Sequence, residues 1–247
     1  MPASRHRVAE PDLYDPAAAW RRAGYYFLGC WVMAIISGAM FRIYRTPAIA
    51  GGNASARDWQ LWTILSLSVV VLAYWVVWPK GTLTHGRERR WGWQLLMGIG
   101  WGVSEGLGML SVWSVLRNFA FSPPWASVVT FGVTGAFLWV WHDKYWDIHV
   151  SPDHNIVEWN PRKVAYCHVP SLVVTLTHLA IYQEPVLFVA FQTLAIVGTV
   201  LAMRFPAPTD PPGPAPISGS PGGTRPHGTA APAPWRRAVD RSRWPSR

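Results

Sequence analysis

Residues 91–116, WGWQLLMGIGWGVSEGLGMLSVWSVL, form one hydrophobic run with a single acidic residue, Glu105, near its middle. As a helix this run is long enough to cross a bilayer, which takes about 20 mainly apolar residues. Its small residues fall at four-residue spacing in two rows, which are Gly98, Gly102 and Gly106, and Gly100, Ser104 and Gly108. Small residues at this spacing let neighbouring helices approach closely. We therefore expect this helix to be packed on two sides, at the centre of a helix bundle.

The composition of the whole chain indicates a membrane protein. The 247 residues are 50% hydrophobic and 14% charged, whereas a soluble domain carries about 25% charged residues. The apolar residues cluster in six runs, which are 24–41, 59–78, 91–116, 124–141, 165–182 and 185–203. The sequence therefore predicts an all-α, polytopic membrane helix bundle with six transmembrane helices.

The basic residues predict the orientation of the bundle. The formal charge is +9, but Lys and Arg lie between the hydrophobic runs and in the tail, so we expect no nucleic-acid partner. They are more numerous before the first run, between the second and third, and between the fourth and fifth, which favours cytoplasmic N- and C-termini. Many Trp residues at the ends of the runs fit an interfacial aromatic belt.

Three regions follow from these patterns. Residues 1–23 are predicted to be a cytoplasmic N-terminal segment, and residues 24–204 a six-helix transmembrane domain. Residues 205–247 are rich in Pro, Gly, Ala, Ser and Arg without apolar periodicity, which predicts a disordered cytoplasmic tail. The bias towards Trp, Arg, Ala, Pro and Gly is compatible with a bacterium of high genomic GC content, so we expect the bacterial plasma membrane.

The first candidate for chemistry is Glu105. A charge near the middle of a bilayer costs at least about 2.5–3.5 kcal/mol, so the carboxyl group must be protonated, paired or solvated. Ionisable residues within membrane spans are functional candidates for this reason. The alternative is a structural role, in which the acid hydrogen-bonds to a neighbouring helix.

The second candidate is the segment that follows the fourth run. Residues 142–155, HDKYWDIHVSPDHN, contain three His and three Asp residues in a chain with eight His in total. If the helix continues into this segment, Asp143 and Asp147 lie one turn apart on one face. His149 and His154 then fall in a loop near the mouth of the bundle. The segment is either an acid/base or divalent-metal cluster, or a solvated polar loop.

The third candidate is a polar stripe on the fifth run. Its members are spaced three or four residues apart and share one helix face: His168, Ser171, Thr175, His178 and Tyr182. We expect the stripe to face the bundle interior, opposite Glu105 or the polar residues of the fourth run. Interhelical hydrogen bonding is the alternative to a catalytic role for His178.

No known motif identifies a cofactor. The histidine boxes of membrane di-iron enzymes, HExxH, GxSxG and a P-loop are all missing from the sequence. His168 and His178 are ten residues apart, about 15 Å along a helix, so they cannot bind the same metal ion. A haem bound by one of them stays open, as does a divalent metal ion held by Asp143, Asp147, His149 or His154. Cys30 and Cys167 are expected to be buried thiols rather than a disulfide.

Two functions of different kinds are compatible with these features. In the first, the protein is an integral membrane enzyme, an isomerase, cyclase or hydratase, that acts on an isoprenoid, sterol-like or acyl lipid in a cavity among the third, fourth and fifth spans. Glu105 would be the general acid or base, helped by His178 and the 142–155 segment, and Trp101, Trp113 and Trp139 would line the pocket. In the second, it is a non-catalytic subunit of a lipid transport or assembly complex, which contacts a protein partner through Gly98, Gly102 and Gly106. A small permease is less favoured, because the sequence shows no internal repeat and no clearly broken pair of helices.

Overall fold

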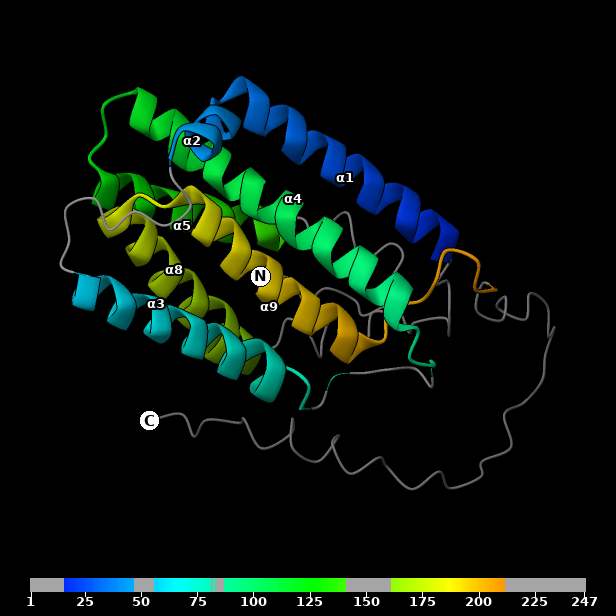
Figure 1. The fold of residues 1–247 in the computed structure, drawn as a ribbon. Helices are drawn as coiled ribbons and strands as arrows, with labels where there is room; N and C mark the ends of the chain where they lie inside the picture. The colour runs from blue at the N-terminus through cyan, green and yellow to red at the C-terminus, as the bar shows by residue number, and fades with distance from the viewer. Residues whose placement is uncertain (1–15, 47–55, 81, 83–86, 141–160, 212–247) are drawn as a thin grey trace, which may run out of the picture. The chain divides into compact units, whose positions relative to one another are not determined.

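The structure is a computed structural model that describes residues 16–46, 56–80, 82, 87–140 and 161–211. The chain divides into two compact units, Met1–Pro216 and Ile217–Arg247, and all described residues belong to the first. Every regular element in the described ranges is helical (Figure 1). The helices are α1 (Pro16–Ile36), α2 (Ala39–Arg45), α3 (Ala56–Val71), η1 (Leu72–Val77), α4 (Trp91–Asn118), α5 (Pro123–Val140), α7 (Pro161–Lys163), η3 (Val164–His168), α8 (Val169–Tyr182) and α9 (Pro185–Met203). The symbol η marks π-helical turns.

Several of these helices are long and apolar enough to cross a membrane. By length and composition four segments qualify: Asp58–Val77, Trp91–Asn118, Val164–Tyr182 and Pro185–Met203. A fifth is added if α1 and α2, which meet at a bend of 69°, are taken as one broken span. The all-helical fold is thus confirmed and is consistent with a multi-pass membrane protein. The number of six spans stays a prediction.

Helix α4 packs along α9, and the two lie side by side in the middle of the first unit (Figure 1). A Cβ atom added at Gly102 would lie 2.5 Å from the Cα atom of Thr193, and one at Gly98 would lie 2.9 Å from the Cα atom of Val197. Only glycine permits such an approach of two helix backbones. The row predicted as a contact for a partner protein is therefore covered by α9 of the same chain.

The second row of small residues lies against α1. A Cβ atom at Gly100 would meet the ring of Phe27 at 3.2 Å, and one at Gly108 would meet the Sγ atom of Cys30 at 3.1 Å. Helix α4 is therefore packed on two sides, as its sequence predicts, with α9 on one row and α1 on the other.

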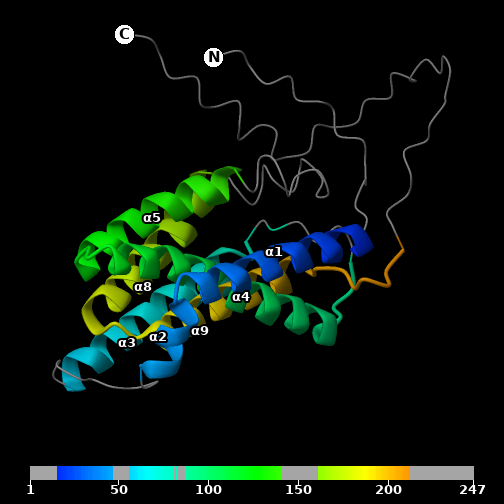
Figure 2. The same cartoon turned by 90° about the horizontal axis from the view of Figure 1, so that it is seen from above.

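The remaining helices complete the bundle on the other side of α9 and α4. Helix α8 contacts α3, α5 and α9, and α5 also contacts α4 (Figure 2). The two π-helical turns η1 and η3 lie against each other, where the hydroxyl group of Tyr74 is 3.0 Å from Nδ1 of His168. In addition, the thiol of Cys167 donates a hydrogen bond to the carbonyl oxygen of Ala73.

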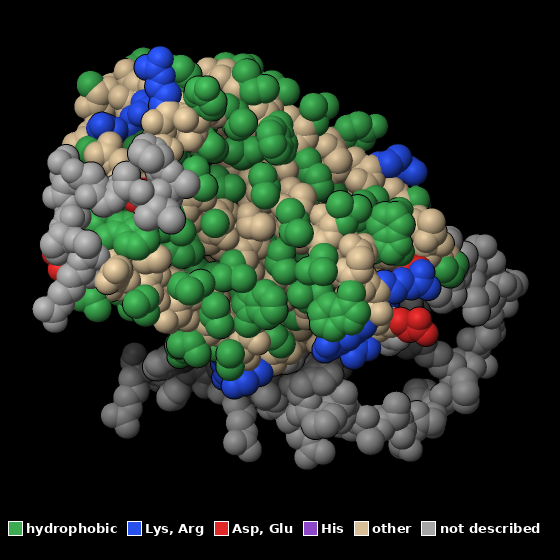
Figure 3. All heavy atoms as spheres, in the orientation of Figure 1, with side chains coloured by type: hydrophobic (Ala, Val, Ile, Leu, Met, Phe, Trp, Pro, Cys, Tyr) green, Lys and Arg blue, Asp and Glu red, His purple; other side chains and the backbone are tan. Residues whose placement is uncertain are grey.

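The helices alternate in direction, so the bundle has two ends. At the Met203 end, which also holds the starts of α1, α4 and η3, Trp20 donates a hydrogen bond to the carbonyl of Pro206 at 2.9 Å. At the Arg117 end, which holds the starts of α3, α5 and α9, Trp59 donates to Glu184 at 2.8 Å. Figure 3 shows hydrophobic side chains spread over the face between the ends, with most charged groups towards its margins.

The first predicted span differs most from the structure. Residues 24–41 were expected to form one span, but α1 begins at Pro16 and ends at Ile36, and the chain then bends into α2. The bend lies at Gly38, whose φ of 77° is a left-handed conformation that favours glycine. The predicted disordered tail begins at residue 205, but residues 205–211 are described and pack on the bundle, because Phe205 and Ala207 are buried and Asp210 forms an ion pair with Arg90 at 2.6 Å. Residues 212–247 lie outside the described residues.

Candidate functional site

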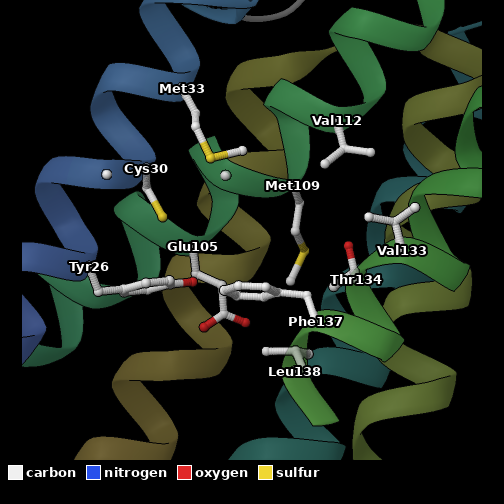
Figure 4. A pocket seen from close by; sticks show the side chains of 12 residues that line it. Tyr26, Cys30, Met33, Glu105, Met109, Val112, Val133, Thr134, Phe137 and Leu138 are labelled. Atoms are coloured by element: carbon white, nitrogen blue, oxygen red, sulfur yellow. The ribbon is translucent and has the colours of Figure 1, made fainter. Parts of the chain in front are cut away.

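Glu105 lies on the wall of a cavity formed by α1, α4 and α5. The cavity has a volume of about 310 Å³, near the lower end of the roughly 300–1,000 Å³ of small-molecule sites. Its wall consists of Tyr26, Gly29, Cys30, Met33, Glu105, Gly108, Met109, Val112, Val133, Thr134, Phe137 and Leu138. Figure 4 shows the side chain of Glu105 between Tyr26 of α1 and Phe137 of α5.

The carboxyl group of Glu105 has no cationic partner among the described residues. Its side chain is 8% exposed, and its hydrogen-bond partner is the side chain of Trp101, one turn earlier on α4. An indole nitrogen can only donate, so Trp101 donates to the carboxyl group and orients it. Glu105 takes part in no ion pair with a described residue.

Aromatic and weakly polar groups surround this acid. The rings of Tyr26 and Phe137 are stacked, with centroids 6.3 Å apart and an angle of 13° between their planes. Tyr26 also contacts the edge of Trp101, with centroids 6.5 Å apart, and its side chain shares a hydrogen bond with Cys30. Thr134 adds one hydroxyl group, and the rest of the wall, apart from Tyr26, Cys30 and Glu105, is apolar.

The cavity opens on the surface of the bundle between α1 and α5. Met33 of α1 is 48% exposed, and Val133 and Phe137 of α5 are each 45% exposed, although all three line the cavity. These apolar side chains form the rim of the opening. If α1 and α5 lie within a bilayer, the opening faces lipid.

The cavity differs from the expected one in the helix that forms its third wall. The cavity was expected among the third, fourth and fifth spans, but α1 forms its third wall instead of α8. Trp101 contacts Glu105 without lining the cavity, and Trp113 lies further along α4, where it donates a hydrogen bond to Ser127 at 3.2 Å. The side chain of Trp139 lies outside the described residues.

His178 does not lie in the cavity of Glu105. Its ring is completely buried between α3, α8 and α9, with Nε2 3.1 Å from the hydroxyl oxygen of Thr63. The ring also packs against Tyr182 and Phe191, with centroids 4.8 Å and 5.6 Å away. Its Nδ1 atom has no hydrogen-bond partner among the described residues. The structure thus does not bring His178 together with Glu105.

The polar stripe faces the bundle interior at its three middle members, whereas His168, which lies in η3, and Tyr182 are half-buried. Ser171 and Thr175 are buried, and the amide nitrogen of Gln192 on α9 donates to the hydroxyl group of Thr175 at 3.1 Å. The stripe therefore packs on α9 and α3, not opposite Glu105. In these contacts it acts through interhelical hydrogen bonds.

The four remaining predicted site residues, Asp143, Asp147, His149 and His154, lie outside the described residues. Their relation to Glu105 stays a prediction. Within the described ranges, no group of three or more His, Cys, Asp or Glu side chains is arranged to hold a metal ion.

The contribution of α1 to the site was not predicted from the sequence. The sequence offers one signal for this contribution, because Tyr26 and Cys30 are four residues apart and so share a helix face. That spacing does not show which helix the face contacts.

A comparison of the chain with protein-family models, curated proteins and solved structures found no match.

Proposed function

We propose that the protein is an integral membrane enzyme that binds part of a lipid molecule in the cavity between α1, α4 and α5. In this proposal, Glu105 transfers a proton to and from the bound molecule. The observation that carries the proposal is the position of this carboxyl group, without a cationic partner among the described residues, on an apolar cavity wall.

The shape and lining of the cavity support a lipidic substrate. Apolar walls stabilise hydrocarbon by burial, at roughly 25 cal/mol per Å² of apolar surface. The opening between Met33 and Phe137 would let a chain enter sideways from the bilayer, without passing through water. The volume fits one segment of an isoprenoid, sterol-like or acyl chain rather than a whole lipid.

A single carboxyl group is sufficient for an isomerisation. The protonated carboxyl of Glu105 would add its proton to one carbon of a double bond, which leaves a cation on the neighbouring carbon. The resulting carboxylate would then remove a proton from the next carbon, so that the double bond moves and the acid is restored. The faces of nearby aromatic rings, Tyr26 and Phe137, would stabilise the cation. In a cyclisation, a second double bond of the same chain would attack the cation and form the new carbon–carbon bond before the carboxylate removes a proton. In a hydration, a water molecule would add to the cation and then lose a proton to the carboxylate.

The proposal includes six spans and cytoplasmic termini. Helix α5 has 18 residues, about 27 Å at 1.5 Å per residue, close to the thickness of the hydrocarbon core. With the Met203 end in the cytoplasm, the larger group of basic residues lies on the cytoplasmic side. The described members of that group are Arg21, Arg22, Lys80, Arg87, Arg89, Arg90, Arg162, Lys163 and Arg204.

The test compares two variants that each neutralise one buried acid. Glu105→Gln removes the acid of the cavity, whereas Glu184→Gln removes an acid that is 1% exposed and lies outside the cavity. Lipid extracts from bacterial cells that express each form would be compared by mass spectrometry and chromatography. We expect the wild type and Glu184→Gln to convert a lipid species that Glu105→Gln leaves unconverted. If both variants change the lipid profile to the same extent as the wild type, the catalytic role of Glu105 is wrong.

A further inference from the structure

Two arginine side chains from different helices lie against one tryptophan at the Arg117 end. The guanidinium carbon of Arg42, on α2, is 5.7 Å from the ring centroid of Trp113, and that of Arg117, on α4, is also 5.7 Å from it. Trp113 is 3% exposed, so the ring is a fixed support for both groups. The two positive charges are close enough to repel each other.

Both guanidinium groups are also held by hydrogen bonds. Arg42 donates to the side-chain oxygen of Asn118 at 2.8 Å, and Asn118 in turn donates to the carbonyl of Ser37 at 3.2 Å. Arg117 donates to the carbonyl of Phe121. Each guanidinium has five N–H donors, so these contacts use only part of their capacity. The Nε atom of Arg117 is buried and has no hydrogen-bond partner among the described residues.

No carboxylate among the described residues of this end balances the pair. Neither arginine forms an ion pair with a described residue, and residues 46–55, which connect α2 towards α3, contain no Asp or Glu. The two acidic residues of this end are Asp58 and Glu184, and both act on Tyr182 at the end of α8. Glu184 is further engaged by Trp59. The counter-charge for the arginine pair must therefore come from outside these segments.

We propose that Arg42 and Arg117 form a binding site for the phosphate group of a membrane lipid at the Arg117 end of the bundle. Arginine binds phosphate through two parallel hydrogen bonds, and two arginines provide two such forks. The surroundings favour a lipid head group as the source of the phosphate. Exposed Tyr and Trp side chains are typical of the membrane interface, and Tyr44 and Trp125 lie exposed at the same end, together with Phe41, Phe119 and Phe121.

If Arg42 and Arg117 only stabilised the ends of their helices, the effect of substituting them would differ from that expected for a phosphate site. Positive side chains stabilise the C-terminal turn of a helix, and Arg42 and Arg117 both lie in such turns. Arg45 lies in the last turn of α2 as well, but its guanidinium carbon is 4.3 Å from the ring of Phe41. If only the helix ends mattered, Arg45 would be equivalent to Arg42.

The experiment measures the binding of three probes to the full chain in detergent micelles by calorimetry. The probes are dioctanoyl phosphatidylglycerol, dioctanoylglycerol, which lacks the phosphate, and inorganic phosphate. The variants are Arg42→Gln, Arg117→Gln and the control Arg45→Gln. Arg117→Lys keeps the charge but not the fork, and it provides a second test if Arg117→Gln does not fold.

We expect phosphatidylglycerol to bind and dioctanoylglycerol not to bind at this site. Loss of one arginine should weaken the binding of phosphatidylglycerol by about tenfold or more, since a hydrogen bond to a charged group contributes at least that factor. Arg45→Gln should leave it unchanged, and Arg117→Lys should weaken it. Inorganic phosphate could also bind as tightly as phosphatidylglycerol, with the same loss of affinity in Arg42→Gln and in Arg117→Gln. This result would support the phosphate site and would assign it to a free anion. Equal binding of both lipids, or equal loss in Arg45→Gln, would overturn the proposal.

Discussion

The contact between α4 and α9 allows a quantitative prediction for Gly102→Ala. A Cβ atom at this position would lie 2.5 Å from the Cα atom of Thr193, whereas ordinary contact begins at 3.4 Å. The obstacle is backbone, so the two helices must separate by about 0.9 Å. Overpacking of this kind costs about 1–3 kcal/mol, and we take the upper end because no side chain can move aside. Alanine returns roughly 1 kcal/mol of helix propensity, which leaves a net loss of about 2 kcal/mol.

Thermal unfolding of the purified protein, followed by tryptophan fluorescence in detergent, measures this loss. For a chain of this size, 1 kcal/mol shifts the Tm by roughly 2–4 °C, so Gly102→Ala should lower it by roughly 4–8 °C. Gly98→Ala and Gly106→Ala should lower it less, because their Cβ atoms would lie 2.9 and 3.1 Å from the nearest backbone atom. Gly132→Ala, which meets nothing within 4 Å, is the control and should be neutral or stabilising. A Tm for Gly102→Ala at or above that of Gly132→Ala would refute the close contact.

Two further predictions concern the cavity and the buried histidine. Gly29→Leu should reduce the lipid that co-purifies with the protein, measured by mass spectrometry, because residue 29 lines the cavity and a Cβ atom there meets nothing within 4 Å; unchanged lipid content at an unchanged Tm would contradict binding in this cavity. Thr63→Val should lower the free energy of unfolding by about 1–3 kcal/mol, because both ring nitrogens of buried His178 would then lack a described partner. Ser66→Ala removes a buried hydroxyl without a described partner, so it breaks no described hydrogen bond and should cost less than Thr63→Val. Equal losses in the two variants would show that the hydrogen bond to His178 contributes nothing.

Much of the fold could be predicted because spacing along one helix determines which residues share a face. The rows of α4 and the interior stripe of α8 follow from this rule, and the sequence places the start of the last helix at Pro185, where α9 begins. The bend between α1 and α2 was missed although Gly38 is present, since a glycine within an apolar run does not have to adopt a positive φ. The π-helical turns were missed because their residues are apolar and aromatic like those of an ordinary span.

The candidate site could be predicted only as far as Glu105. A single helix shows that the acid is within the apolar run, but not which neighbours face it. That depends on the order of helices around the bundle, where α1 occupies the place expected for α8. The same limit applies to the arginine pair. Arg42 and Arg117 are 75 residues apart in the chain, and only the bend at Gly38 and the folded position of α2 bring both to Trp113.

The π-helical turns η1 and η3 lie against each other, so the number of residues in one turn is tied to the number in the other. Each of these turns contains one residue more than an α-helical turn, and one residue corresponds to a rotation of about 100°. Deleting a residue from one turn alone would rotate the helix beyond it, and would carry either Tyr74 or His168 away from the other. A shortened form of the protein that keeps this pairing would therefore need a compensating change in the opposite turn.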